Sequence, residues 1–134
     1  AGHSQALLQA LPEARLLGID RDPTALAAAS ERLQRFGDRV CLAKGNFAEL
    51  PRLLRESGFA AARPQCDAVL ADLGVSSPQL DRAERGFSFR MDGPLDMRMD
   101  PTDPGLRPAS WYVANLPHSD LTKHICELGE EEPA

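Results

Sequence analysis

Short apolar segments that alternate with helical segments are the feature that most constrains the fold of this chain. Arg15–Asp20 and Arg39–Ala43 have the pattern of buried strands, and Thr24–Phe36 between them has apolar residues at helical spacing. A second helix is expected over Ala48–Glu56, followed by a third strand over Cys66–Asp72. Strands that alternate with helices predict a parallel sheet with right-handed crossovers. We therefore expect an α/β fold.

Capping residues predict where the first of these helices begins and ends. Asp22 is suited to cap the helix that runs to Phe36, and Pro23 fits the first helical turn, where its missing N–H is not needed. Gly37 is placed to end the helix. Ser4–Leu11 also has apolar residues at helical spacing, which predicts the end of an earlier helix.

The chain changes character after Leu73. Residues 74–107 are rich in Gly, Pro, Ser, Asp and Arg, with few apolar residues in any register. A loop of this length inside a compact domain is usually functional or disordered, and its Phe and Met residues argue against disorder. Helical spacing resumes over Pro108–Leu116 and Ser119–Leu128, with Ser119 as the expected cap.

Charged residues of both signs occupy the part of this loop from Arg82 to Asp100. Four arginines oppose four acidic residues, so the stretch is neutral. Arginine interleaved with Phe and Met suits phosphate contact and base stacking in RNA. A loop whose charges pair with one another and that packs on the sheet would have the same composition. Composition leaves both interpretations open.

Composition narrows the class of protein. The 134 residues allow one domain of ordinary size, and a net charge of −5 argues mildly against nucleic acid as a partner. No apolar run approaches the roughly 18 residues that a membrane span needs. Cys41, Cys66 and Cys126 form no C-x-x-C pair, so neither a disulfide framework nor a metal site is predicted. We expect Cys41 and Cys66 to be buried thiols in a reducing compartment.

Candidate site residues follow the three predicted strands, because ligands of open α/β sheets bind outside the carboxyl ends of the strands. Asp20 ends the first strand, where a carboxylate can accept hydrogen bonds from both hydroxyls of a ribose. Phe47 follows the second, where its ring can pack on an adenine while the Asn46 amide contacts the base edge. Asp72 ends the third and could orient an amine or a cationic part of a cofactor. The structural alternatives are a helix partner for Asp20 and a core position for Phe47.

A further candidate lies upstream, where Gly2 and His3 precede the first predicted helix. A glycine at this position lets a ligand approach the backbone amides of a helix N-terminus. Asp20 lies 18 positions after Gly2, which is compatible with the loop-to-acid distance of dinucleotide and nucleoside folds. This spacing does not separate NAD from S-adenosylmethionine.

Several longer motifs together closely resemble the MraW (also called RsmH) family. These motifs are DRDP at 20–23, GNF at 45–47, DLGVSSPQLD at 72–81, ERGFSF at 84–89 and DGPLDMRMD at 92–100. The resemblance implies an S-adenosylmethionine-dependent methyltransferase that acts on cytosine N4 in small-subunit ribosomal RNA. It covers nearly the whole chain, and the run from 72 to 100 is its most specific part.

The resemblance also implies roles for individual residues. Asp20 matches the ribose-binding acid and Phe47 the residue beside the adenine. Asp72 is in addition our candidate for the catalytic hydrogen-bond acceptor of the target amine. The full set of expected cofactor-binding residues is Ala1, Gly2, His3, Asp20, Phe47, Asp72 and Gln79, in which the first three match the end of the glycine-rich loop around the methionine moiety.

The fold implied by the resemblance is a class I methyltransferase sheet, Rossmann-like, with a helical domain inserted into it. We expect residues 1–107 to form a partial S-adenosylmethionine-binding domain that includes the loop 73–107, and residues 108–134 to begin the helical insert. Family members show several glycines before the His and an earlier acid-ended strand, whereas only Ala1-Gly2 stand here. We therefore expect the chain to be a fragment.

Partner, location and rival functions follow from the same reasoning. The expected partner is small-subunit ribosomal RNA, in the cytoplasm of a bacterium or the mitochondrial matrix of a eukaryote. One alternative is a truncated, non-catalytic chain that binds RNA or a protein partner. A second is a nicotinamide-dependent oxidoreductase, which the spacing from Gly2 to Asp20 permits but nothing in the run from 72 to 100 supports.

Overall fold

A computed structural model describes residues 1–59 and 66–129 of the chain. The chain divides into two compact units, Ala1–Ala71 and Asp72–Ala134, and each is considered by itself. The first unit contains the sheet and the second contains the long motif loop and two helices.

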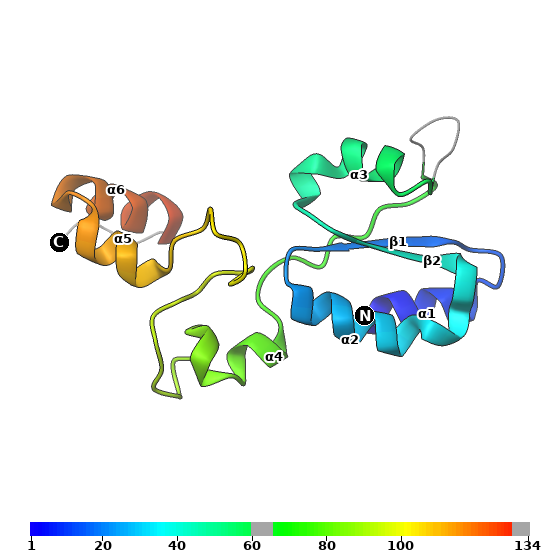
Figure 1. Cartoon of the computed structure of the whole chain (residues 1–134), viewed down its shortest axis with the longest axis horizontal. Helices are drawn as coiled ribbons and strands as arrows, with labels where there is room; N and C mark the ends of the chain where they lie inside the picture. The colour runs from blue at the N-terminus through cyan, green and yellow to red at the C-terminus, as the bar shows by residue number, and fades with distance from the viewer. Residues whose placement is uncertain (60–65, 130–134) are drawn as a thin grey trace. The chain divides into compact units, whose positions relative to one another are not determined.

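The first unit alternates helices with two strands (Figure 1). The strands lie between α1 and α2 on one face and α3 on the other (Figure 1). Its elements in chain order are α1 (Gly2–Ala10), β1 (Leu16–Asp20), α2 (Pro23–Leu33), the 3-10 helix η1 (Gln34–Arg39), β2 (Val40–Lys44), the 3-10 helix η2 (Phe47–Glu49) and α3 (Leu50–Glu56).

The two strands pair in parallel, as the sequence predicts. Their register runs from Leu16 opposite Val40 to Asp20 opposite Lys44, so both strands end at the same edge of the sheet. The N–H of Gly45 donates to the carbonyl oxygen of Asp20 at 3.0 Å and continues the pairing one step beyond β2. The carboxyl ends of β1 and β2 therefore lie side by side.

The predicted cap of α2 is confirmed. Asp22 is buried, its carboxylate oxygen Oδ1 accepts the N–H of Thr24 at 2.9 Å, and Pro23 is the first residue of the helix. The α-helix ends at Leu33, and η1 continues the turn as far as Arg39. Gly37 has a φ of 54°, a left-handed conformation that a glycine adopts without a Cβ clash.

Arg39 ties the end of α1 to the start of β2. Its guanidinium donates to the carbonyl oxygens of Leu8 at 3.0 Å, Leu11 at 3.0 Å, Pro12 at 2.6 Å and Ala14 at 3.3 Å. The last carbonyls of an α-helix have no partner inside the helix, so a cation at this position satisfies them and opposes the negative end of the helix dipole.

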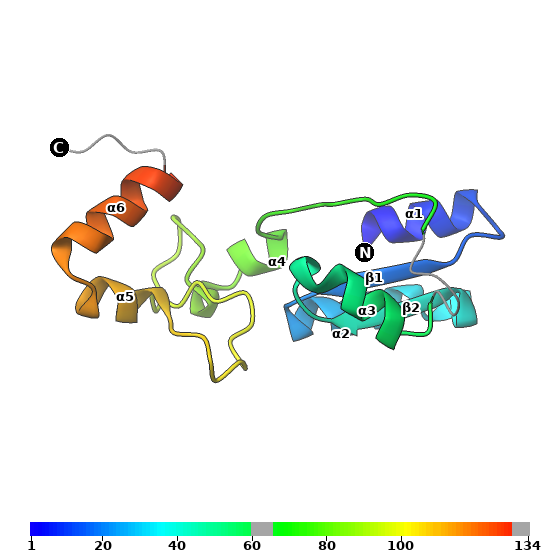
Figure 2. The same ribbon diagram turned by 90° about the horizontal axis from the view of Figure 1, so that it is seen from above.

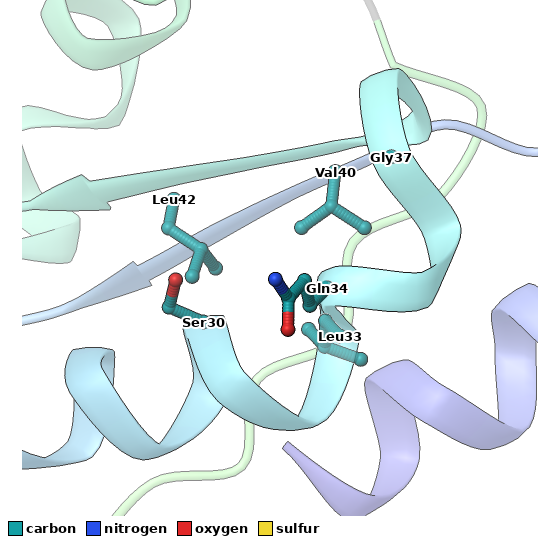
Figure 3. Close-up of a pocket in the computed structure, with 6 residues that line it drawn as sticks. All are labelled: Ser30, Leu33, Gln34, Gly37, Val40 and Leu42. Atoms are coloured by element: carbon teal, nitrogen blue, oxygen red, sulfur yellow. The ribbon is translucent and has the colours of Figure 1, made fainter.

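Leucine side chains form the buried core of the first unit: Leu8, Leu33, Leu53 and Leu54. A hollow of about 240 Å³ lies between α2, η1 and β2 (Figure 3). Its lining residues are Ser30, Leu33, Gln34, Gly37, Val40 and Leu42. Asp20 and Phe47 are not among them, so this hollow is separate from the edge where the strands end.

The third predicted strand, Cys66–Asp72, is wrong. This segment is extended but pairs with no strand in the described residues, and Val69 and Leu70 are 70% and 64% exposed. In a doubly wound sheet of order 3-2-1-4, β1 and β2 of this chain would take positions 2 and 3. The next strand along the chain takes position 4, where its neighbour is the strand at position 1. The described residues contain no strand before β1, so the segment has no neighbour with which to form a ladder. Consequently Cys66 is exposed, against expectation, while Cys41 is half-buried.

The second unit has short helical turns in the motif loop and two helices after it. These elements are α4 (Ser77–Leu80), the 3-10 helix η3 (Ala83–Arg85), α5 (Ala109–Asn115) and α6 (His118–Gly129), seen again from above in Figure 2. The two predicted helices are confirmed. The predicted cap at Ser119 is wrong, because the Pro117 carbonyl already accepts the N–H groups of Asp120 and Leu121 at 3.0 Å and α6 begins at His118. No helix among the residues described has the length and apolar character that a membrane crossing requires.

Candidate cofactor site and motif loop

Asp20 and Phe47 both lie at the carboxyl edge of the strand pair. Asp20 is the last residue of β1, and its carbonyl oxygen accepts the Gly45 N–H at 3.0 Å. Phe47 follows two residues after Gly45 as the first residue of η2, and its side chain is 67% exposed. The structure thus brings together the two residues that the sequence assigns to a ribose and an adenine.

The Asp20 carboxylate is exposed and only partly engaged. Its oxygen Oδ1 accepts the main-chain N–H of Asp22 at 2.9 Å. Asp22 itself caps α2, so the structural alternative for Asp20 is filled by its neighbour. Within the described residues Asp20 makes no hydrogen bond through Oδ2, and that oxygen can accept from a ribose hydroxyl.

A capping box formed by Asn46 and Glu49 fixes the turn that carries Phe47. Asn46 Oδ1 accepts the Ala48 N–H at 3.0 Å, and the Glu49 carboxylate accepts the Asn46 N–H at 3.5 Å. The Arg52 guanidinium, 3.1 Å from Glu49, holds the pKa of that carboxyl below its usual range. The Asn46 side chain therefore serves the turn, and the expected contact of its amide with a base edge would require this cap to open.

The N-terminus of α1 carries the upstream candidates. Ala1 is the residue before the helix, Gly2 and His3 are its first two residues, and all three are exposed. Because α1 runs antiparallel to β1, this helix end is directed toward the edge where the strands end (Figure 1). A Cβ built on Gly2 would meet no atom within 4 Å, so the backbone here is open to an anionic group.

Asp72 and Gln79 belong to the second unit. Asp72 is exposed and follows no strand among the described residues. Gln79 is buried, its Oε1 accepts the Ser76 N–H at 2.9 Å, and its Nε2 lies 3.5 Å from the Met99 sulfur. These contacts give Gln79 a structural role in the loop. The cofactor contact expected of each residue stays a prediction.

Buried Arg85 joins two of the sequence motifs in the loop. Its guanidinium donates to the carbonyl oxygens of Arg98 at 3.1 Å and Met99 at 3.0 Å, and its own carbonyl accepts the Met97 N–H at 3.0 Å. The segment 84–89 is thereby fastened to the segment 92–100. Met97 has a φ of 58°, the one positive φ of a non-glycine residue in the part of the chain described.

Acidic side chains of the motif loop form hydrogen bonds and an ion pair with other residues of the same loop. Asp96 and Arg98 form a forked ion pair with contacts of 2.9 and 2.7 Å, and the hydrogen bonds from Arg98 lower the pKa of the Asp96 carboxyl. Buried Asp100 accepts the N–H and the hydroxyl of Thr102 at 3.0 and 2.6 Å. Self-paired charges, one of the two interpretations left open by composition, describe this part of the loop. Arg85 and Asp100 both lie inside the recognised motifs, but residue type and spacing predicted no role of their own for either.

Among the described residues, no three His, Cys, Asp or Glu side chains lie close enough together to bind a metal ion.

Parallel strands that alternate with helices, with an acid and an aromatic ring at their carboxyl edge, define an incomplete Rossmann-like fold of the class I methyltransferase type. The profile of the MraW methylase family matches residues 1–134. The chain belongs to this family, as its motifs indicated.

Bacterial relatives extend this similarity to individual proteins. The chain is 56% identical over 130 residues to the ribosomal RNA small subunit methyltransferase H of Mycobacterium tuberculosis. It is 50% identical over 130 residues to the protein of the same name from Prochlorococcus marinus and 50% over 131 residues to that from Syntrophobacter fumaroxidans. Each match covers 97% of this chain but 32%, 38% and 39% of the respective relative, so the chain spans about a third of their length.

Proposed function

We propose that the protein transfers a methyl group from S-adenosylmethionine to N4 of a cytidine in small-subunit ribosomal RNA. The observation that carries the proposal is the location of Asp20 and Phe47 at the same carboxyl edge of a parallel strand pair, in a member of the MraW methylase family. The name of its bacterial relatives, ribosomal RNA small subunit methyltransferase H, supports the choice of substrate.

The residues at this edge fit a nucleoside cofactor. The exposed Asp20 carboxylate suits the ribose, and the exposed Phe47 ring suits the flat face of the adenine. The open helix N-terminus at Ala1, Gly2 and His3 suits the carboxylate of the methionine moiety. Asp72 and Gln79 complete the proposed cofactor-binding set.

S-adenosylmethionine, when bound, supplies an electrophilic methyl group next to a positively charged sulfur. The cytosine amine is a weak nucleophile because its lone pair is delocalised into the ring, so alignment of the two reactants is the main task of the protein. Asp72 is our candidate acceptor for the amine N–H as positive charge develops on that nitrogen. The target base must leave its stack to reach such a site.

The proposed partner is small-subunit ribosomal RNA, and the proposed location is the bacterial cytoplasm, since the relatives compared here come from bacteria. The proposed domain boundary stays at Arg107. Pro108 is the residue before α5, and this supports the assignment of 108–134 to the start of a helical insert.

Methyl transfer tests the proposal directly. We expect tritium to pass from labelled S-adenosylmethionine to small-subunit ribosomal RNA and to appear in N4-methylcytidine after nuclease digestion. Asp72→Ala should reduce the rate at saturating cofactor, whereas Asp38→Ala, which removes an exposed acid from η1, should not. Wild-type turnover in Asp72→Ala would end the role of that side chain, and NADH binding without S-adenosylmethionine binding would favour the oxidoreductase.

A further inference from the structure

Phe89 stands at the tip of a loop formed by residues 86–93, which we call the Phe89 loop. Its side chain is fully exposed, and Arg90 beside it is exposed as well. Phe87, two residues earlier, is half-buried and lies under the Arg85 guanidinium, 6.0 Å from the centre of the ring. Phe87 therefore packs against Arg85, whereas Phe89 is exposed to solvent.

Both ends of the Phe89 loop are closely packed against backbone. Gly86 has a φ of 74°, and a Cβ there would lie 2.4 Å from the Pro94 carbonyl oxygen. A Cβ on Gly93 would lie 2.1 Å from the Ala83 carbonyl oxygen. Only glycine fits at either position, so the two ends of the loop are held near each other.

Hydrogen bonds order the tip and the base of the loop. The Ser88 hydroxyl oxygen accepts the N–H groups of Arg90 and Met91, both at 3.2 Å. At the base, the buried Arg85 guanidinium binds the carbonyls of Arg98 and Met99. The exposed ring is therefore carried by an ordered backbone, which lowers the entropy that a ligand must remove when it binds.

An exposed aromatic ring next to an arginine suits an unpaired nucleobase. A base stacks on the ring face whatever its identity, and the guanidinium can contact the adjoining phosphate. The base that receives a methyl group needs a closed pocket that excludes water, which an open loop tip does not provide. The Phe89 loop thus suits a base that is held rather than modified.

We propose that Phe89 stacks on an unpaired nucleotide of the RNA substrate, with Arg90 on its phosphate. The proposal rests on the proposed function for the choice of RNA. It assigns the loop to recognition of a single-stranded segment and leaves the cofactor site to Asp20 and Phe47.

Binding of RNA by Phe89 variants tests this inference. The affinity for a short, fluorescently labelled single-stranded RNA and for small-subunit ribosomal RNA is measured by anisotropy and filter binding over a series of salt concentrations. Phe89→Ala should weaken binding roughly 5- to 150-fold, the range that base–aromatic stacking provides, and Phe89→Trp should restore it. Leu128→Ala, which removes an exposed apolar side chain from α6, is the matched control and should bind as the wild type does.

Salt dependence separates the two side chains. Phe89→Ala should leave the slope of log affinity against log salt unchanged, because a stacked ring releases no counterions. Arg90→Gln should lower the slope by about 0.7, the contribution of one phosphate contact on a single strand. The inference is overturned if Phe89→Ala binds RNA with wild-type affinity, or if Phe89→Leu binds as well as Phe89→Trp.

Thermal unfolding and cofactor binding identify the other outcomes. Phe89→Ala should leave the Tm and the S-adenosylmethionine Kd unchanged. A lower Tm with unchanged RNA affinity means that the ring packs inside the protein or against a protein partner, and the stacking role is wrong. If the wild type methylates RNA while Phe89→Ala keeps full affinity, only this inference fails. If Phe89 supports RNA binding but the wild type transfers no methyl group, only the proposed function fails.

Discussion

The carboxylate of Asp20 accepts a 2.9 Å hydrogen bond from the main-chain N–H of Asp22, and the Asp22 carboxylate in turn accepts the N–H of Thr24. Two acids two positions apart therefore have different environments. Asp22 is buried at the start of α2, while Asp20 is exposed at the end of β1. Asp22 therefore serves helix α2, and the proposed ligand contact belongs to Asp20.

Substitution of each acid should separate these roles. Asp22→Ala removes a helix cap and should lower the free energy of unfolding by about 1–2 kcal/mol. Asp20→Ala should leave the unfolding free energy within about 1 kcal/mol of wild type but weaken S-adenosylmethionine binding at least about 10-fold, by loss of a charged hydrogen-bond acceptor. Urea denaturation and calorimetric titration measure the two effects. Equal loss of stability in both variants would contradict the division.

Arg39→Ala should destabilise the first unit. The substitution removes the guanidinium from one carbonyl in the last turn of α1 and from three in the segment after it, and we expect a loss of about 1–3 kcal/mol. Arg35→Ala is the control, since Arg35 is exposed and its guanidinium lies 4.9 Å from the centre of the Phe36 ring, as that of Arg39 does at 5.3 Å. Among the described residues, the Arg35 guanidinium binds no carbonyl. Its effect should stay within about 0.5 kcal/mol. Equal urea midpoints for the two variants would show that the carbonyl contacts are not stabilising.

Gly93→Ala should disrupt the Phe89 loop. The new Cβ would collide with the Ala83 carbonyl oxygen, and a main-chain shift at a constrained site costs about 1–3 kcal/mol. Gly105→Ala is the milder comparison, because its Cβ would meet only the end of the Asp103 side chain, at 3.2 Å. Limited proteolysis followed by mass spectrometry should find new cleavage between 83 and 98 in Gly93→Ala alone. An uncut loop in this variant would contradict the close packing.

The ion pair of Asp96 and Arg98 predicts a pH dependence of stability. Because the folded state lowers the pKa of Asp96, its stabilising effect is complete above the unfolded pKa of about 3.9 and is lost as the pH falls through the lower, folded value. The difference in unfolding free energy between wild type and Asp96→Asn should therefore be constant from neutral pH to about pH 5 and shrink in stronger acid. Urea titrations at several pH values measure it, with Asp38→Asn as a charge-matched control. A difference that grows on acidification would contradict the assignment.

Local signals predicted the elements of the first unit well. Asp22 and Pro23 act on the residues immediately after them, so the start of α2 was readable without any tertiary information. The parallel pairing of β1 and β2 followed from the helix between them. Arg39 was not predicted, because its carbonyl partners lie 25–31 positions earlier in the chain and no local pattern marks them.

The prediction of a strand over Cys66–Asp72 was wrong because a strand also depends on a neighbour elsewhere in the chain. Its apolar pattern is that of a strand, but a strand forms only where a second backbone segment pairs with it. The apolar pattern of one segment does not indicate whether such a partner is present. The predicted cap at Ser119 was wrong because the carbonyl of Pro117, two residues earlier, accepts the N–H groups of Asp120 and Leu121.

The candidate site was predictable in part. Asp20 and Phe47 could be placed at one edge because parallel strands end together. Gln79 and Asn46 could not be assigned from their residue type, because an amide that contacts a ligand and an amide that caps a turn are chemically the same. The structure uses both as caps.

Met97 keeps its backbone in a conformation that L-amino acids avoid, with a φ of 58° between the ion-paired Asp96 and Arg98. A glycine would adopt the same angles without the Cβ clash, so this sequence holds a side chain where a smaller one would give easier folding. A backbone angle of this kind persists where the surrounding contacts fix it, and here the Met97 N–H is bound by the Arg85 carbonyl while its two neighbours form an ion pair. A glycine at residue 97 would relieve this backbone strain while leaving the ion pair in place, which makes the position a candidate for a stabilising substitution.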